Sequence, residues 1–453
     1  MDASFIEEYK EFLKNGKTER ECCNQIVELA KKNGYKDIGE TQSLHAGDKV
    51  YVTKFGKAVA LFNIGSEPIE KGMNILGAHI DSPRLDVKQN PLYEKEFLVY
   101  LNTHYYGGIK KYQWLTLPLA IHGVVCKKDG SVVQVCIGEK NDDPVFCISD
   151  ILPHLAQKQM KESAADFVPG ESLDLILGSE IPPAKNDAGV AGGEAADKQE
   201  KDKAKKLVLS LLKEQYGMEE ADFGSAELEI VPAGAPRDLG FDRSLILAYG
   251  QDDRSCAYAS VRAQFDTVSV ARTSCCLCVD KEEIGSVGAT GMDSHFFENC
   301  VAEVVARLGT YSELSVRRCM NNSNMLSSDV NAAFDPMNGD LYDHENASYL
   351  GAGIVFNKYT GSRGKYGASD ASPEFIAKLR NILDQHNVRY QMAELGKVDQ
   401  GGGGTIAYLA AKYGMYVLDA GVSVLSMHAP WEITSKEDMW QAFNAYKAFL
   451  LLQ

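Results

Sequence analysis

One short run, residues 279–286, constrains this 453-residue chain more than any other stretch. It reads Val-Asp-Lys-Glu-Glu-Ile-Gly-Ser, so two adjacent carboxylates, Glu282 and Glu283, close an apolar segment and precede a glycine. Neighbouring side chains at the end of a strand point to opposite sides. One glutamate can therefore bind a metal ion while the other accepts a proton from water. A lone Glu-Glu pair is more often a solvated acidic turn, so the interpretation depends on the rest of the chain.

Four further segments place metal-ligand residue types next to apolar runs. In residues 75–83 an apolar strand ends in His79-Ile-Asp81, where the carboxylate could orient the imidazole. The other three segments carry, in chain order, Asp252-Asp253, Asp329 and His428. Each is weak alone, because an aspartate at a strand end usually caps a turn or helix. Together, the order His, Asp, Glu-Glu, Asp, His suits two metal ions bridged by one carboxylate.

With these segments the chain resembles the aspartyl aminopeptidase and vacuolar aminopeptidase I family of dinuclear zinc exopeptidases. The motifs that carry the resemblance are G-A-H-I-D-S-P, Y-G-G, a tryptophan, P-L, P-H-L-A, D-K-E-E-I-G-S, T-I and S-M-H, in family order. They cover essentially the whole chain. The resemblance implies an α/β fold of the zinc exopeptidase type, in which a central, mostly parallel sheet is flanked by helices and a β-rich domain is inserted.

The resemblance also implies roles for individual residues. The implied metal ligands are His79 and Asp329 for one ion, Glu283 and His428 for the other, and Asp252 as the bridge. Asp253 stays open as the alternative bridge. Glu282 is the implied general base, and Asp81 the support of His79. The implied substrate-binding residues are His154 and Lys365.

The implied reaction is the removal of N-terminal residues from peptides by water activated at two divalent metal ions. Zinc is the expected metal, with cobalt and manganese as alternatives. Two other classes of protein stay open: a related deacylase or carboxypeptidase with the same catalytic core, and a non-catalytic assembly or storage protein. The segment around Lys365 resembles the side-chain pocket of aspartyl members, so an acidic first residue is one expected substrate. A surface lysine with an apolar, vacuolar-type preference is the alternative.

Charge and composition disfavour several partners. With 63 acidic against 47 basic residues, the net charge of −16 argues against nucleic acid and anionic membranes as partners. The sequence shows no apolar run of about 18 residues and no basic–apolar leader. Its eleven cysteines are odd in number and lack the spacing of a zinc knuckle, so reduced core thiols are expected. A cytoplasmic location follows as the expectation.

Helix caps and apolar runs outline the expected secondary structure. Ser4 with Glu7 and Thr18 with Glu21 predict two capped helix starts. Apolar runs predict buried strands at residues 58–64, 73–80, 274–280, 416–419 and 423–426. A final helix is expected from Ser435. Strands that alternate with helices predict an α/β sheet with helices on both faces.

Between residues 92 and 236 the pattern changes. This stretch is rich in valine and turn residues, and its segment 185–204 is of low complexity, with Gly, Ala, Asp and Lys. We therefore expect a catalytic domain in two parts, residues 1–91 and 237–453, interrupted by a β-rich dimerisation domain at residues 92–236 with a mobile loop at 185–204. The resemblance implies homodimers that assemble further into a dodecamer.

Overall fold

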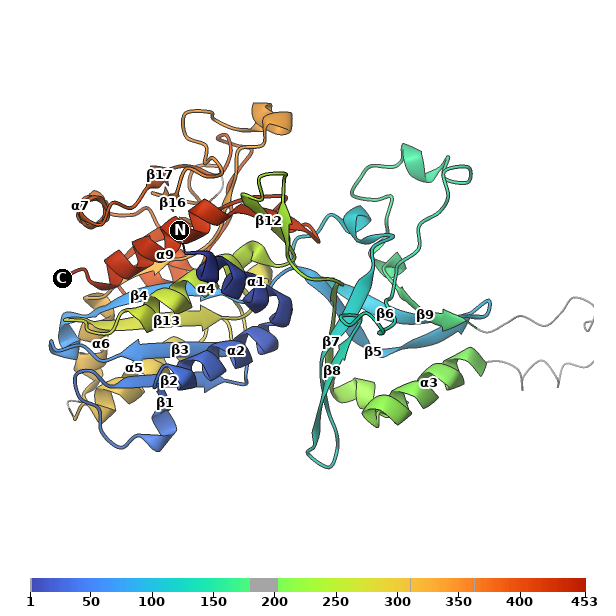
Figure 1. Ribbon diagram of the computed structural model, residues 1–453, viewed down its shortest axis with the longest axis horizontal. Helices are drawn as coiled ribbons and strands as arrows, with labels where there is room; N and C mark the ends of the chain where they lie inside the picture. Colours follow the sequence, from blue (N-terminus) through green and yellow to red (C-terminus); the bar gives the residue numbers. More distant parts are fainter. Residues whose placement is uncertain (1, 180–202, 310, 362) are drawn as a thin grey trace, which may run out of the picture. The chain divides into compact units, whose positions relative to one another are not determined.

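The computed structural model describes residues 2–179, 203–309, 311–361 and 363–453 (Figure 1). The chain divides into two compact units, one made of Met1–Ser82 with Ala235–Gln453 and one made of Pro83–Gly234. The first boundary thus falls after Ser82, whereas the sequence suggested residue 91. Residues 185–202, most of the expected loop, lie outside the described residues.

Across the described part of the larger unit, nine strands form one mixed sheet in the order β1-β2-β3-β13-β4-β14-β18-β16-β17. The four central strands β13, β4, β14 and β18 are parallel, while β2-β3, β3-β13 and β16-β18 are antiparallel pairs. The bounds are β1 Lys36–Asp37, β2 Lys49–Lys54, β3 Ala58–Asn63, β4 Met73–His79, β13 Thr273–Val279, β14 Asn324–Ser327, β16 Ile354–Asn357, β17 Tyr390–Met392 and β18 Tyr416–Gly421. The expected α/β fold is confirmed.

Two hydrophobic cores cover the two faces of this sheet, because side chains alternate along each strand. In β13, Cys276 and Cys278 belong to one core, whereas Cys275, Leu277 and Val279 belong to the other. Helices α1, α2, α4, α7 and α9 contribute to the first core, and α5, α6 and α8 to the second. Their bounds are α1 Ala3–Asn15, α2 Glu19–Lys32, α4 Gln251–Asp266, α5 Phe296–Arg307, α6 Glu313–Asn321, α7 Pro373–Gln385, α8 Ala407–Ala411 and α9 Lys436–Leu450.

Helix starts agree with the sequence at two of three expected places. Thr18 caps α2 through the reciprocal hydrogen bonds of a capping box, and Ser435 caps α9. The predicted Ser4–Glu7 capping box is wrong, because the cap of α1 is Asp2, two residues before Ser4. The Asp2 carboxylate accepts hydrogen bonds from both the backbone N–H and the hydroxyl of Ser4, each at 2.9 Å. The Ser4 hydroxyl is thereby engaged as a donor.

A second, smaller sheet belongs to the same unit and has the strand order β11-β12-β20-β19-β15. Its bounds are β11 Arg237–Leu239, β12 Leu245–Ala248, β15 Asn331–Ala332, β19 Ser423–Leu425 and β20 Glu432–Ser435. The chain passes from β12 directly into α4, and β19 and β20 are joined by the loop that carries His428. This sheet therefore supplies residues that the main sheet cannot.

The unit Pro83–Gly234 contains an antiparallel sheet in the order β8-β7-β10-β5-β6-β9. Its bounds are β5 Arg84–Lys95, β6 Leu98–Tyr106, β7 Leu119–Cys126, β8 Val132–Ile137, β9 Leu175–Ser179 and β10 Ala226–Pro232, with helix α3 at Lys203–Tyr216. Among the described residues of the whole chain, we find no helix with the length and apolarity needed to cross a membrane.

Candidate metal centre

The centre forms where the parallel strands of the main sheet end. Parallel strands share a carboxyl edge, and ligands of open α/β sheets bind at that edge. His79 is the last residue of β4 and is in register with Val279 of β13. Glu282 and Glu283 lie just after β13 in a short 3-10 turn, and Asp329 follows β14. The topology therefore collects residues that are far apart in sequence.

Two groups of three ligand-type side chains share one carboxylate. The first group is His79, Asp252 and Asp329, and the second is Asp252, Glu283 and His428. In the first, His79 Nε2 lies 3.2 Å from Asp252 Oδ1 and 3.9 Å from Asp329 Oδ1. In the second, His428 Nε2 lies 3.3 Å from Asp252 Oδ2 and 3.5 Å from Glu283 Oε2. The two oxygens of Asp252 thus face different groups.

Of the two aspartates left open by the sequence, Asp252 is the one that joins both groups. Asp253 is fully buried, and neither of its carboxylate oxygens has a hydrogen-bond partner among the described residues. The carbonyl oxygen of Asp252 accepts a hydrogen bond from the Ser82 hydroxyl at 2.6 Å. This bond fixes the backbone of the shared residue beside the end of β4.

Asp81 ties together the histidine and the glutamate pair. Its Oδ1 lies 3.3 Å from Nδ1 of His79, and its carbonyl oxygen lies 3.1 Å from the same nitrogen. The carboxylate also accepts the backbone N–H groups of Glu282 and Glu283, both at 3.2 Å. One buried carboxylate therefore orients a ring and a turn at once. Such partners fix the tautomer of a metal-binding histidine.

Glu282 stands apart from both groups but close to them. Its Oε2 lies 3.9 Å from Nε2 of His79. Burial, reinforced by the negative charge of Asp252, raises the pKa of Glu282 to about 7 in the absence of metal. A carboxylate with a pKa near neutrality can both accept and return a proton.

The electrostatics of the groups call for a cation. Burial raises the pKa of Asp329 and of Glu283 well above the ordinary range. Burial also acts on Asp252, but hydrogen bonds from His428 and His79 outweigh it and lower the pKa of that carboxyl. Several carboxylates thus share a buried space in which His79 and His428 are the positive partners named among the described residues. A divalent ion would keep these acids ionised.

The donor set fits a zinc ion. Imidazole nitrogen and carboxylate oxygen are ordinary zinc ligands. Glu283 Oε1 is buried and has no hydrogen-bond partner in the described part of the chain, so it retains lone pairs for a ligand. The residues present are therefore consistent with the metal that this arrangement implies.

A cavity of about 460 Å³ opens over the two groups. It is lined by Asp252, Glu282, Glu283, Asp329 and His428, and also by Asn357, Thr360, Leu395, Gly402, Gly403, Gly404, Thr405, Tyr408 and Asp419. Three consecutive glycines thus contribute to the cavity wall. Burial raises the pKa of Asp419 to about 6, although it accepts a hydrogen bond from the Thr405 hydroxyl at 2.6 Å.

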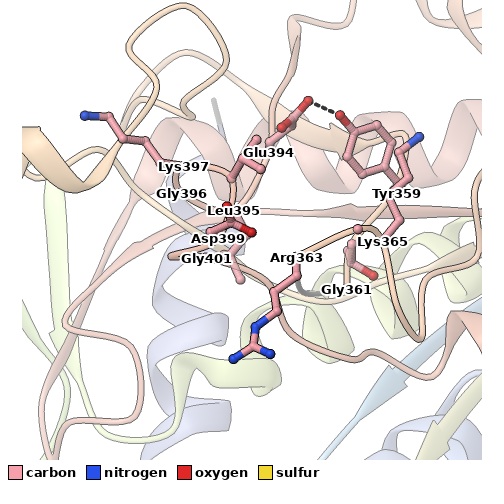
Figure 2. A pocket seen from close by; sticks show the side chains of 13 residues that line it. Tyr359, Gly361, Arg363, Lys365, Glu394, Leu395, Gly396, Lys397, Asp399 and Gly401 are labelled. Atoms are coloured by element: carbon pink, nitrogen blue, oxygen red, sulfur yellow. Dashed lines mark hydrogen bonds between the residues drawn. The ribbon is translucent and has the colours of Figure 1, made fainter.

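Lys365 lines a neighbouring cavity of about 350 Å³ instead. Thr360 lines both this cavity and the cavity over the metal-ligand groups. Figure 2 shows the Lys365 ammonium beside the ring of Tyr359, whose hydroxyl is bonded to Glu394. The ammonium lies 3.7 Å from the ring centroid and 3.2 Å from Asp370 Oδ2. The charge of Lys365 is therefore already compensated.

His154 is placed in the unit Pro83–Gly234, where its side chain is exposed. It is not one of the residues that the main sheet collects. The structure thus brings seven of the nine expected site residues into one cluster, namely His79, Asp81, Asp252, Glu282, Glu283, Asp329 and His428.

Glu432 is a buried residue of this region that the sequence did not reveal. Burial raises its pKa to about 8, and its two oxygens accept N–H groups of Asp252 and His428. It lies four residues after His428, a spacing that carries no signal outside a helix. Only the pairing of β20 with β12 brings it beside Asp252.

The chain is similar to known proteins over its full length. Residues 12–450 match the family described as aminopeptidase I zinc metalloprotease (M18). A probable M18 family aminopeptidase 1 of Clostridium acetobutylicum is 55% identical over 446 residues, which cover 98% of this chain and 93% of the relative.

Solved structures agree with that match. The crystal structure of an M18 family aminopeptidase from Thermotoga maritima superposes with a TM-score of 0.92 at 42% identity, covering 99% of this chain and 96% of the other. The S. cerevisiae mApe1 dodecamer has the same fold, with a TM-score of 0.74 at 20% identity over 98% of this chain and 95% of that one. With a family match across nearly all of its residues, the chain belongs to the M18 family of metal-dependent aminopeptidases.

Proposed function

We propose that this aminopeptidase works with two divalent metal ions, most simply zinc. One ion would be held by His79, Asp252 and Asp329, and the other by Asp252, Glu283 and His428. The observation that carries this proposal is the shared carboxylate, whose two oxygens face one histidine each at 3.2 and 3.3 Å. A single ion in either group would leave two of the five ligand-type side chains without a cation, one of them a largely buried carboxylate. Uncompensated buried carboxylates are costly.

Two bound ions would polarise the scissile carbonyl and acidify a water molecule. Glu282 is then the group that accepts the proton of the attacking water, because it lines the cavity and belongs to neither ligand group. After attack, the protonated Glu282 returns that proton to the leaving amine nitrogen. The Asp81 carboxylate keeps Glu282 in place by accepting the backbone N–H of Glu282. The reaction also requires hydrogen-bond donors or a cation that stabilise the negative charge developing on the carbonyl oxygen.

The substrate enters with its free α-amine among the acidic side chains of the cavity. Negatively charged carboxylates attract a protonated α-amine, whereas an acylated amine carries no charge and is not attracted in this way. We propose that the first side chain lies toward the cavity that Lys365 lines. Because Asp370 already compensates Lys365, we infer at most a modest preference for acidic residues. The role of His154 in substrate binding stays a prediction, tested by His154→Ala.

Reconstitution with metal followed by paired assays tests this function. The metal-free protein should take up two zinc ions per chain and then hydrolyse aminoacyl p-nitroanilides. The N-acetylated analogues, which lack the free amine, should be inert. Cleavage of the acetylated substrates would instead indicate a deacylase-like reaction, and uptake of one ion per chain would contradict the two-ion site.

We further propose that the unit Pro83–Gly234 mediates homodimers and that these assemble into a dodecamer, as in S. cerevisiae mApe1. Support comes from the exposed apolar side chains of a short segment in this unit, Ile151, Leu152, Leu155 and Met160. Exposed apolar patches usually mark interaction surfaces. Native mass measurement tests the assembly, and a monomer would contradict it.

A cytoplasmic location is also proposed. All eleven cysteines of the sequence are free thiols in the described residues. Unpaired cysteines are typical of reducing compartments. Fractionation of the producing cells is the direct measurement.

A further inference from the structure

Glu432 occupies a position that links two ligand-bearing segments. It is the first residue of β20, it is 1% exposed, and it pairs with Ala248 at the end of β12. Directly after β12 the chain reaches Asp252, and four residues before Glu432 lies His428. The side chain of Glu432 therefore stands between the two places where the small sheet delivers metal-ligand residues.

Each oxygen of Glu432 accepts one backbone N–H. Oε2 accepts the N–H of Asp252 at 3.0 Å, and Oε1 accepts the N–H of His428 at 2.8 Å. Its backbone carbonyl accepts a further bond from the Gln251 side chain at 2.7 Å. One residue thus fixes the amide of the shared ligand and the amide of the ligand opposite it.

The backbone around His428 needs such support. His428 has φ 64° and Ser426 has φ 60°, so both occupy the left-handed region, which is unfavourable for residues other than glycine. Residues in this region persist when surrounding contacts hold them. The bond from His428 N–H to Glu432 is one contact, and the bond from Ala429 N–H to the Ser426 carbonyl at 2.9 Å is another.

We propose that Glu432 is a positioning residue for the metal centre, which sets the affinity of the ion held by Asp252, Glu283 and His428 through the two backbone amides that it accepts. This role rests on the proposed two-ion site. It parallels the role of Asp81, which holds the amides of Glu282 and Glu283 on the other side of the centre. Loss of a supporting residue typically costs about 10- to 100-fold in metal affinity or activity.

Glu432→Gln is the test variant. It keeps the size of the side chain but turns an NH2 group toward one of the two N–H donors, so only one bond survives. Zinc affinity of the metal-free protein, measured by competition with a chromogenic chelator, should fall by about 10- to 100-fold for one of the two ions. Saturating zinc should restore most of the kcat. Glu432→Asp is one methylene shorter, so it should also lose one bond and show a loss of zinc affinity.

Asp438→Asn is the matched control. Asp438 is also fully buried and also accepts two backbone N–H groups, those of Gly351 and Gly353 at 2.8 Å, but neither donor is a metal-ligand residue. This variant should lower the melting temperature while binding zinc as the wild type does. The control separates a general loss of stability from a loss of metal positioning.

The outcomes are distinguishable. Wild-type zinc affinity in both Glu432 variants, or an equal loss in Asp438→Asn, would overturn the role of Glu432 while leaving the two-ion site intact. A wild-type protein that binds fewer than two zinc ions would overturn the two-ion proposal and, with it, this role. A drop in kcat that saturating zinc fails to restore would also overturn it, because a positioning role acts through metal occupancy.

Discussion

The two sides of the catalytic cavity are built in different ways. On the side of the metal groups, the backbones of Asp252, Glu282, Glu283 and His428 are each held by a buried carboxylate. At the glycine rim of the cavity, Gly403 and Gly404 are exposed, and the chain is held by bonds such as Gly361 N–H to the Gly403 carbonyl and the Thr405 hydroxyl to Asp419. The difference teaches that several buried hydrogen bonds fix the backbone on the metal side, whereas part of the glycine rim is exposed to solvent.

This contrast predicts where substitutions act on all substrates and where they act on some. Changes on the metal side should alter metal binding or turnover for every substrate alike. Changes on the rim should be smaller and should depend on the substrate's first side chain, since surface loops on rigid scaffolds commonly carry specificity.

The largest effect is expected for Glu282→Gln. This variant should keep both metal ions and lose about 10²- to 10⁴-fold in kcat for every aminoacyl substrate, because only proton transfer is removed. Glu283→Gln is the matched control. It makes the same carboxylate-to-amide change in the adjacent residue, and it should lose metal instead. Metal content measured beside kcat decides between them. Metal loss in Glu282→Gln with full occupancy in Glu283→Gln would reverse the assignment.

The second effect concerns metal removal, and it tests whether the two ions on the metal side are released equally easily. The side chain of His79 is 2% exposed, whereas that of His428 is 37% exposed. A chelator should therefore remove the ion beside His428 first. His428→Ala should retain one ion per chain. Its affinity for the second ion should fall by more than the roughly 10- to 100-fold expected on loss of a supporting residue. Release of both ions in one kinetic step would show that the two groups do not differ.

Much of the metal side could be predicted from the sequence, because its residues follow apolar strands. The runs before His79 and Glu282 became β4 and β13, as predicted, and parallel pairing also brought in the end of β14, which was not among the expected strands. Strands that are buried on both faces read as continuous apolar runs, which makes them visible in one sequence. The family resemblance supplied the roles, which strand pattern alone does not.

Other features could not be predicted, because they depend on contacts between distant segments. Glu432 meets Asp252 across 180 residues, and nothing near it in sequence marks it as buried. The position of Lys365 in a neighbouring cavity also depends on how the loops fold, and its pairing with Asp370 is not visible as a pattern. At the N-terminus the sequence predicted Ser4 as the cap, whereas Asp2 holds that position, because its carboxylate accepts the backbone N–H and the hydroxyl of Ser4.

A smaller, substrate-dependent effect is expected on the rim. Lys365→Met should lower kcat/KM for aspartyl and glutamyl substrates by about tenfold or less relative to leucyl ones, since an exposed, paired ammonium discriminates weakly. Arg363→Met serves as the control, because Arg363 lines the same cavity and is also exposed. Equal losses for both variants and all substrates would mean that neither cation reads the first side chain.

The smallest effect concerns stability and depends on pH. Asp419 anchors the rim to β18 by accepting the Thr405 hydroxyl, and its other oxygen is buried without a hydrogen-bond partner among the described residues. Burial raises the pKa of Asp419 from 3.8 to about 6. A folded-state pKa above the unfolded value means that the protonated form is favoured by folding. The resulting stability is present in full below about pH 4 and is lost as the pH rises through 6.

Asp419→Asn removes this titration but retains an oxygen for Thr405. Relative to the variant, the wild type should lose roughly 3 kcal/mol or less in free energy of unfolding between pH 4 and pH 7, the equivalent of its pKa shift. Denaturant unfolding of both metal-free proteins at a series of pH values measures the difference, in which other titrating groups cancel. Turnover at saturating zinc should change little, because Asp419 belongs to the rim. A stability difference that stays constant with pH would show that Asp419 is ionised in the folded protein, and a large loss of turnover would move it from the rim to the catalytic side.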